Sequence, residues 1–226
     1  MSARIGVIQF PGTNCELDAV HACEVLGASA ELLWHRESSP ISVDAVIVPG
    51  GFAHGDYLRT GAIARFSPVM NALQEFAEAG GPVVGICNGF QILCEAAMLP
   101  GALQKNAGMK FRCEMSTLVV ASQRSVLTAD IELGAELRIP INHFEGNYTC
   151  DAATLEQLRG DDRIVLRYLE NPNGSLDDIA GICNDTGNVV GLMPHPERAC
   201  ESVLGSIDGA ALLGSLLRHA LITATR

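Results

Sequence analysis

Strand-sized apolar runs alternate with helical segments through the first hundred residues of this chain. The runs, rich in Val, Ile and Leu, cover residues 4–10, 30–35, 45–48 and 82–86. Apolar and polar residues do not alternate within them, which is typical of parallel strands covered on both faces. Residues 15–26 and 68–79 read as helices between strands. The alternation predicts an α/β fold, with an open, mainly parallel, doubly wound sheet and flanking helices.

The pattern changes after Pro100. Short strand signals separated by turn residues replace the alternation, at residues 111–122, 125–129, 138–141, 163–170, 179–184 and 188–193. We expect these strands to form an antiparallel extension on the edge of the sheet. Residues 100–106 are expected to be a loop, and the apolar spacing of residues 208–223 predicts a closing amphipathic helix.

Length and composition exclude several classes of partner and location, but they place few limits on the fold. With 226 residues, 48% hydrophobic and 18% charged, the chain can build a large core, and we expect one domain over residues 1–226. The net charge of -11 argues against binding nucleic acid. We expect no membrane segment and no signal peptide, hence a cytoplasmic protein. The eight cysteines lack a Cys-x-x-Cys pair, which favours reduced thiols over disulfides or a metal site.

The segment Gly85-Ile86-Cys87-Asn88-Gly89 joins the fourth apolar run to a helical stretch. A side chain on a sharp strand-to-helix turn stands clear of the backbone, and flanking glycines are needed where Cβ atoms would clash. The helix N-terminus behind Cys87 is expected to favour the thiolate. A cysteine at the end of a buried strand is usually a core residue. The two glycines favour the other interpretation, in which Cys87 is a nucleophile.

A base and a carboxylate follow the last apolar run, in the segment Pro194-His195-Pro196-Glu197. Both come at the carboxyl edge of the sheet, where α/β proteins place their sites. We expect Pro196 to hold the backbone extended, so that residues 195 and 197 point the same way. Glu197 would then orient the imidazole of His195 while the other ring nitrogen faces the thiol. His143 is a further candidate, in a loop-like segment.

Acyl transfer also needs N–H donors for the developing oxyanion. The amide of Asn88, directly after the nucleophile, is one source. The turn Pro49-Gly50-Gly51-Phe52 is a second source, although Gly-Gly could merely end a strand. Gly51, Phe52 and Asn88 are therefore candidate substrate-binding residues. The chain carries neither the Gly-x-x-x-x-Gly-Lys loop nor the Gly-x-Gly-x-x-Gly fingerprint, so we expect no ATP or nicotinamide binding by this chain alone.

The elbow, continued to Phe90 and Gln91, and the Pro-His-Pro-Glu segment together resemble the class I, triad-type glutamine amidotransferases, which release ammonia from glutamine. Further motifs are similar to those of the small, separate glutaminase subunits (PurQ-type) of phosphoribosylformylglycinamidine synthase. They are FPGTNC at residues 10–15, PGGF at 49–52, GDYLR at 55–59, NPNGS at 171–175 and MPHPERA at 193–199. The resemblance therefore covers essentially the whole chain.

This resemblance implies a flavodoxin-like amidotransferase domain that serves purine biosynthesis. Cys87, His195 and Glu197 would form the triad, L-glutamine would be hydrolysed through a Cys87 thioester, and Gln91 would contact the glutamine. No cofactor is implied for this chain. A PurL-type synthetase subunit would hold ATP and Mg²⁺ and use the ammonia to convert formylglycinamide ribonucleotide to formylglycinamidine ribonucleotide. Residues 55–65 would face that synthetase, and a small PurS-type accessory subunit would complete the complex.

Two segments depart from the family pattern. Members commonly carry Phe-Ser-Tyr-Gly-Asp at residues 52–56, where this chain has FAHGD, and His-Gly-Glu-Gly at residues 143–146, where it has HFEG. The second change places Phe144 where glycine would allow more backbone conformations. Two rival functions remain: a stand-alone thiol hydrolase or stress protein of the related elbow-cysteine α/β group, and a regulatory binding subunit with a relic site.

Overall fold

A computed structural model of the chain describes residues 2–223. Its main sheet has the strand order β2-β1-β3-β4-β11-β10-β9-β6-β7. These strands are β1 (Arg4–Gln9), β2 (Ser29–Trp34), β3 (Ala45–Val48), β4 (Val83–Ile86), β6 (Arg112–Val120), β7 (Glu136–His143), β9 (Ile164–Tyr168), β10 (Ile179–Cys183) and β11 (Val189–Leu192). A second, two-stranded sheet pairs β5 (Ala102–Gln104) with β8 (Asn147–Thr149).

The main sheet has a parallel part and an antiparallel part. Strands β2, β1, β3, β4 and β11 run parallel, in the order of a doubly wound sheet of the flavodoxin type. Strands β10, β9, β6 and β7 continue the sheet with antiparallel pairing. The predicted fold class, a mainly parallel α/β sheet with an antiparallel extension, is therefore confirmed.

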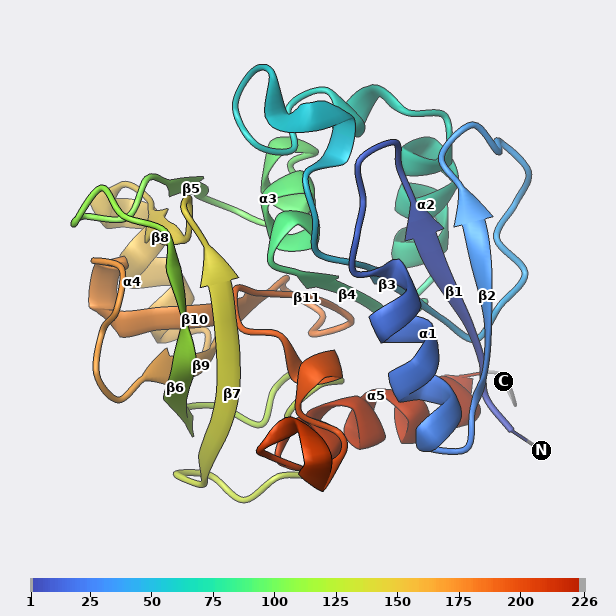
Figure 1. Ribbon diagram of the computed structural model, residues 1–226. Coiled ribbons are helices and arrows are strands. Elements are labelled where there is room, and N and C mark those ends of the chain that lie inside the picture. The colour runs from blue at the N-terminus through green and yellow to red at the C-terminus, as the bar shows by residue number, and fades with distance from the viewer. Residues whose placement is uncertain (1, 224–226) are drawn as a thin grey trace.

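Helices cover both faces of the parallel part (Figure 1). The helices of the described chain are α1 (Glu16–Val25), α2 (Val69–Glu78), α3 (Asn88–Glu95), α4 (Ala152–Gly160) and α5 (Gly209–Thr223). In Figure 1, α1 and α5 lie on one face of the parallel strands, and α2 and α3 lie on the other. Helix α1 begins after Cys15, whose side chain makes no capping bond. The nearby Thr13 hydroxyl accepts a hydrogen bond from the Phe10 amide at 3.0 Å and does not cap the helix either.

The edge strand β2 differs from the prediction. Strands β3, β4 and β11 are buried at every residue, as expected for central parallel strands. Every residue of β2 is at least partly exposed, and Leu32 and Trp34 are among the exposed ones. Strand β2 has only β1 as a neighbour, and an apolar run without alternation does not reveal whether a strand lies at the centre or at the edge.

Several elements beyond residue 100 also differ from the prediction. Residues 188–193 were expected in the antiparallel extension, but β11 pairs with β4 as a central parallel strand. Residues 125–129 were expected to be a strand, but they form a turn in which the Ser125 carbonyl accepts from two following amides. The expected loop at residues 100–106 contains β5. Helix α4 was not predicted, although Asp151 caps it by accepting from the Thr154 amide at 2.7 Å.

Strand pairing places the carboxyl ends of three strands side by side. Ile86, the last residue of β4, pairs with Leu192, the last residue of β11. On the other side of β4, Gly85 pairs with Val48 at the end of β3. The segments that follow these three strands therefore leave the sheet next to one another. Within residues 2–223, no helix is long and apolar enough to cross a membrane.

Candidate active site

Cys87 lies on a strained turn between β4 and α3. Its φ of 51° and ψ of -105° are sparsely populated by residues other than glycine. The turn is held from both sides, because the Cys87 amide donates to the Leu192 carbonyl and the Cys87 carbonyl accepts from the Gln91 amide. A Cβ on Gly89 would overlap the Val48 carbonyl oxygen. A Cβ on Gly85 would lie 2.7 Å from the Gly89 backbone. Both flanking glycines thus have the steric role that the sequence suggested: Gly89 lets the elbow approach β3, and Gly85 lets α3 approach β4.

His195 and Glu197 form a buried pair beside the elbow. Glu197 Oε1 lies 2.6 Å from His195 Nδ1, and the two side chains are 0% and 1% exposed. The expected reason for their contact is wrong, because residues Pro196–Arg198 form a 3-10 turn rather than an extended segment. The turn folds the carboxylate back onto the imidazole, and the His195 amide is anchored to the Pro140 carbonyl at 2.8 Å.

The surroundings of His195 favour its protonated form. Burial by itself lowers the pKa of His195, but the Glu197 carboxylate and, after it, the Cys87 sulfur raise that pKa well above 6.5. The Nε2 atom is buried and has no hydrogen-bond partner within residues 2–223. His195 and Cys87 line the same cavity. The free ring nitrogen is therefore available to exchange a proton with a molecule that enters this cavity.

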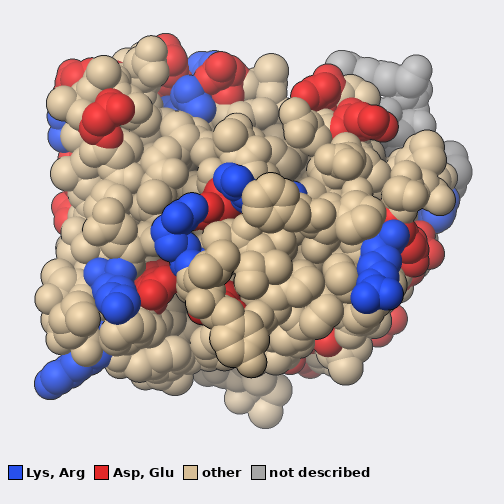
Figure 2. Space-filling view, turned by 90° about the horizontal axis from the view of Figure 1, so that it is seen from above, with Lys and Arg blue, Asp and Glu red and all other residues tan. Residues whose placement is uncertain are grey.

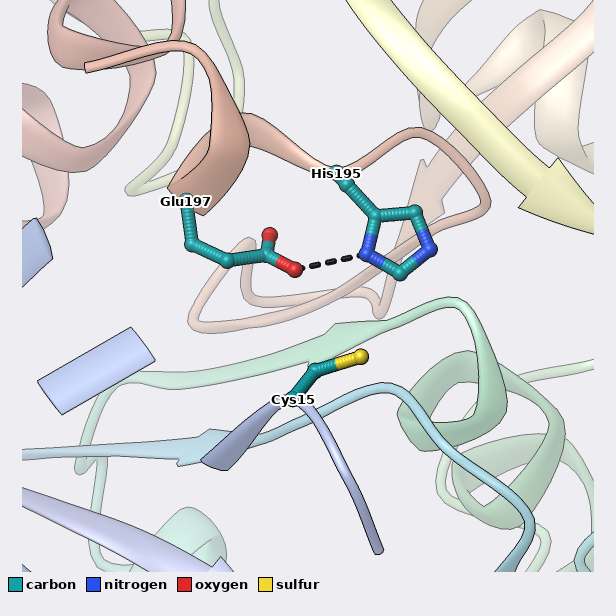
Figure 3. A group of neighbouring side chains, drawn as sticks. All are labelled: Cys15, His195 and Glu197. Atoms are coloured by element: carbon teal, nitrogen blue, oxygen red, sulfur yellow. Dashed lines mark hydrogen bonds and ion pairs between the residues drawn. The ribbon is translucent and has the colours of Figure 1, made fainter. Parts of the chain in front are cut away.

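Cys15, at the start of α1, lies against the His195–Glu197 pair (Figure 3). Single ligand atoms of Cys15, His195 and Glu197 lie within 4.8 Å of one another. Three such ligand atoms could in principle hold a cation. However, His195 Nδ1 and Glu197 Oε1 are already hydrogen-bonded to each other, and the Arg198 guanidinium donates to Cys15 Sγ at 3.1 Å. A guanidinium in contact with the sulfur opposes a second positive charge. The arrangement therefore suits proton transfer better than metal binding.

The cavity beside Cys87 has a volume of about 230 Å³. Of the residues predicted for the site, Gly51, Phe52, Cys87, Gln91, His195 and the further candidate His143 line it. The remaining lining residues are Asn14, Cys15, Asp56, Thr60, Phe111, Asn142, Phe144 and Glu145. Asn142 also accepts a hydrogen bond from Cys87 Sγ through its carbonyl, at 3.7 Å.

The glycine turn after β3 packs closely against the site. A Cβ on Gly50 would lie 2.7 Å from His195 Cε1 and 3.1 Å from Cys15 Sγ, so only glycine leaves room for both. Gly51 has a φ of 144° and lines the cavity. The Asn88 side chain ties this turn to the elbow, since Oδ1 accepts from the Ala53 amide at 3.0 Å. Only the backbone of Asn88 is therefore free to serve a substrate.

The loop after β7 also lines the cavity. Gln91 Nε2 donates to the Glu145 carbonyl at 2.5 Å, which joins this loop to α3. His143 lines the cavity but is neutral, because burial and then His195 lower its pKa to about 4. Phe144 is not among the described residues with positive φ. Its carbonyl accepts from the Asn106 amide at 2.9 Å, so the loop does not need glycine at this position.

The sequence did not single out seven of the cavity residues: Asn14, Cys15, Asp56, Thr60, Phe111, Asn142 and Glu145. Cys15 was grouped with the reduced thiols, and Asp56 and Thr60 were placed only in a segment expected to face a partner. One sequence feature could have indicated Asp56 as a site residue. It is an acidic residue that directly follows Gly55, a few residues after the Gly50-Gly51 turn. No local pattern brings Cys15 to His195, because that contact crosses 180 residues of sequence.

Comparison with known proteins gives a consistent result. The family model described as CobB/CobQ-like glutamine amidotransferase domain matches residues 2–211. The chain is similar to the protein named phosphoribosylformylglycinamidine synthase subunit PurQ of Rubrobacter xylanophilus, with 54% identity over 97% of this chain and 100% of the relative. The identity to the protein of the same name from Helicobacter hepaticus is 50%, over 96% of this chain and 98% of the relative.

Solved structures agree with the sequence matches. A chain of the structure described as PurLQS from Thermotoga maritima is similar, with a TM-score of 0.89 and 40% identity over 97% of this chain and 99% of that chain. A putative GMP synthase component from Thermoplasma acidophilum has a TM-score of 0.72 at 14% identity, over 100% of this chain and 97% of that chain. That second likeness concerns the fold alone.

Proposed function

This chain belongs to the glutamine amidotransferase family, among the PurQ-type glutaminase subunits of phosphoribosylformylglycinamidine synthase, and we propose that its Cys87 pocket hydrolyses L-glutamine. The observation that carries the proposal is the strained Cys87 turn next to the buried His195–Glu197 pair. We propose that residues 1–226 act as one glutamine amidotransferase type-1 domain, the first residue and the last three lying outside the described structure.

The reaction starts from a Cys87 thiolate and a His195 imidazolium. The thiolate attacks the side-chain amide carbon of glutamine, and the tetrahedral intermediate collapses when His195 gives its proton to the departing nitrogen, which leaves as ammonia. The neutral imidazole then takes a proton from water, the hydroxide attacks the thioester, and glutamate leaves with the thiolate restored. Glu197 holds Nδ1 throughout and stabilises each imidazolium.

Backbone amides stabilise the charge that develops on the carbonyl oxygen. The donors in this proposal are the Asn88 N–H, at the N-terminus of α3, and the Gly51 N–H of the glycine turn. Gly51 accepts no side chain without strain, because a Cβ would come within 2.7 Å of the Asn14 backbone nitrogen. Phe52 and Gln91, which both line the cavity, would contact the bound glutamine.

The ammonia would be used by a synthetase subunit that docks over the cavity mouth. Phe52 and Phe111 line the cavity and are about half exposed. Tyr57 and Leu58, in the segment that follows Phe52, are 87% and 69% exposed. Figure 2 looks down on this end of the molecule and shows a mostly uncharged surface with scattered charged residues of both signs. Such an apolar rim is typical of a protein interface. A PurL-type partner with ATP and Mg²⁺, completed by a PurS-type subunit, fits this surface.

Glutamine hydrolysis by the chain alone and with its synthetase and ATP tests the proposal. Stimulation by the synthetase supports the amidotransferase. Activity that is indifferent to it supports a stand-alone hydrolase, and silence throughout supports a relic site. Cys87→Ala should abolish hydrolysis while partner binding persists, and Cys113→Ala, which removes an exposed thiol on β6, should leave hydrolysis intact. Normal hydrolysis by the Cys87→Ala variant would rule out the mechanism.

A further inference from the structure

The charges that line the cavity are unbalanced. Asp56 and Glu145 are its two acidic residues, and none of the described residues that line it is a lysine or arginine. Neither carboxylate takes part in an ion pair within residues 2–223. The same cavity contains His195, whose 1% exposed side chain leaves Nε2 without a partner. The cavity therefore has negative charge at Asp56 and Glu145 and, separately, a nitrogen that can transfer a proton at His195.

Asp56 is held rigidly at the cavity wall. Its φ is 51°, directly after Gly55 at 75°, which fixes the direction of the side chain by an unusual backbone turn. The Asp56 Oδ1 atom is buried and has no hydrogen-bond partner within residues 2–223. A Cβ on Gly61 would lie 2.8 Å from the Ile92 nitrogen, so this loop packs on the backbone of α3. Helix α3 thus positions both Cys87 and the Asp56 carboxylate.

Glu145 is held by hydrogen bonds from the loop that contains Asp56 and from α3. Thr60 Oγ1 donates to its Oε2 at 3.0 Å, and the Glu145 carbonyl accepts from Gln91. Burial and then the nearby Glu145 charge raise the pKa of Asp56 to about 6. Two carboxylates that repel each other in this way are stabilised by a cation placed between them. Of the groups that L-glutamine carries, only its α-ammonium is positively charged.

We propose that the Asp56 carboxylate, assisted by Glu145, binds the α-ammonium group of the substrate and makes the enzyme specific for an α-amino acid amide. This inference rests on the proposed glutaminase function. The substrate amide would then point toward Cys87, with its positively charged end held at the cavity wall. Asp56 contributes to binding rather than to the chemical steps, so its removal should change KM and leave kcat nearly unaltered.

The test uses the complex with the synthetase and two substrates, L-glutamine and glutaramate, which is glutamine without the α-amino group. For glutamine, Asp56→Asn should raise KM about 10- to 100-fold, the range for a lost hydrogen bond to a charged group. The wild-type complex should hydrolyse glutaramate with a low kcat/KM, and Asp56→Asn should not lower that kcat/KM further. Glu145→Gln should raise the KM for glutamine less, because Thr60 still holds the side chain. Asp161→Asn, on an exposed residue after α4, is the matched control.

The outcomes separate the two proposals. If the wild-type complex fails to hydrolyse glutamine, the proposed function is wrong. If the wild type is active and Asp56→Asn has an unchanged KM, the ammonium site alone is wrong. An equal loss on both substrates would also overturn it, because a structural defect does not distinguish them. The wild-type KM for glutamine should in addition rise as the pH falls through about 6, and this rise should disappear in Asp56→Asn.

Discussion

Replacing Glu197 by Gln removes one charge from the pair that holds His195 and leaves the size of the side chain nearly unchanged. The two side chains are almost completely buried and in contact at 2.6 Å, so solvent does not screen their interaction. A hydrogen bond between charged groups contributes about 1.5–3 kcal/mol, and about 1.4 kcal/mol corresponds to a tenfold change. We therefore expect kcat/KM for glutamine to fall about 10- to 100-fold in Glu197→Gln.

The variant should also change the protonation of His195. Without the carboxylate, burial is the largest influence on this imidazole, and burial lowers its pKa. His195 should therefore be protonated at neutral pH in the wild type and neutral in Glu197→Gln. A titration of the His195 ring followed by NMR from about pH 5 to 9, a range around the ordinary histidine pKa, reports this change directly, and steady-state glutamine hydrolysis in the complex reports kcat/KM.

The chain offers a matched control for this change. Glu201 Oε2 lies 2.7 Å from His21 Nε2 in another His–Glu pair, in which the His21 side chain is 61% exposed. Glu201→Gln makes the same chemical change at the surface, where such pairs contribute little, and should leave kcat/KM unchanged. The reasoning is refuted if Glu197→Gln retains kcat/KM within twofold of wild type, or if Glu201→Gln loses as much.

Two further predictions concern the fold of the site. Gly89→Ala should abolish glutamine hydrolysis and lower the urea midpoint, because the new Cβ meets the Val48 carbonyl. Gly160→Ala, with open space around its Cα at the end of α4, should leave hydrolysis unchanged and should not lower the midpoint, since alanine favours the helix; equal losses in the two variants would contradict the elbow packing. His143 has a folded-state pKa of about 4, below the unfolded value of about 6.5, so its contribution to stability is lost as the pH falls through that range. The stability difference between wild type and His143→Gln, from urea unfolding, should therefore shift against wild type by about 2 kcal/mol between pH 7 and 5; no shift would mean that His143 titrates normally.

The parts of the site that the sequence predicted are contacts between residues that are close together in the sequence. Gly85 and Gly89 around Cys87 indicate a local steric requirement, which the structure shows as close packing of Gly89 on β3 and of Gly85 on α3. The His195–Glu197 contact was predicted although the backbone between them is a turn, because two residues of separation allow contact in either geometry. The catalytic roles of these residues, the single domain and the cytoplasmic location stay predictions.

The parts that the sequence missed depend on packing between distant segments. Cys15 reaches His195 because Gly50 has no side chain to separate them. Asp56 reaches the cavity because Gly61 lets its loop lie on α3. The central position of β11 was missed for a similar reason: its apolar residues fit an edge or a centre equally well, and only the pairing with β4 decides. Periodicity within a segment carries no information on such contacts.

The central claim is that the Cys87 sulfur becomes bonded to the glutamyl group during turnover. Acid quenching during glutamine hydrolysis, followed by intact-protein and peptide mass spectrometry, measures this directly. We predict a mass increase of one glutamyl group, located on the peptide that contains Cys87 and absent in the Cys87→Ser variant. A glutamyl group found on Cys15, or turnover that continues in the Cys87→Ser variant, would contradict the account.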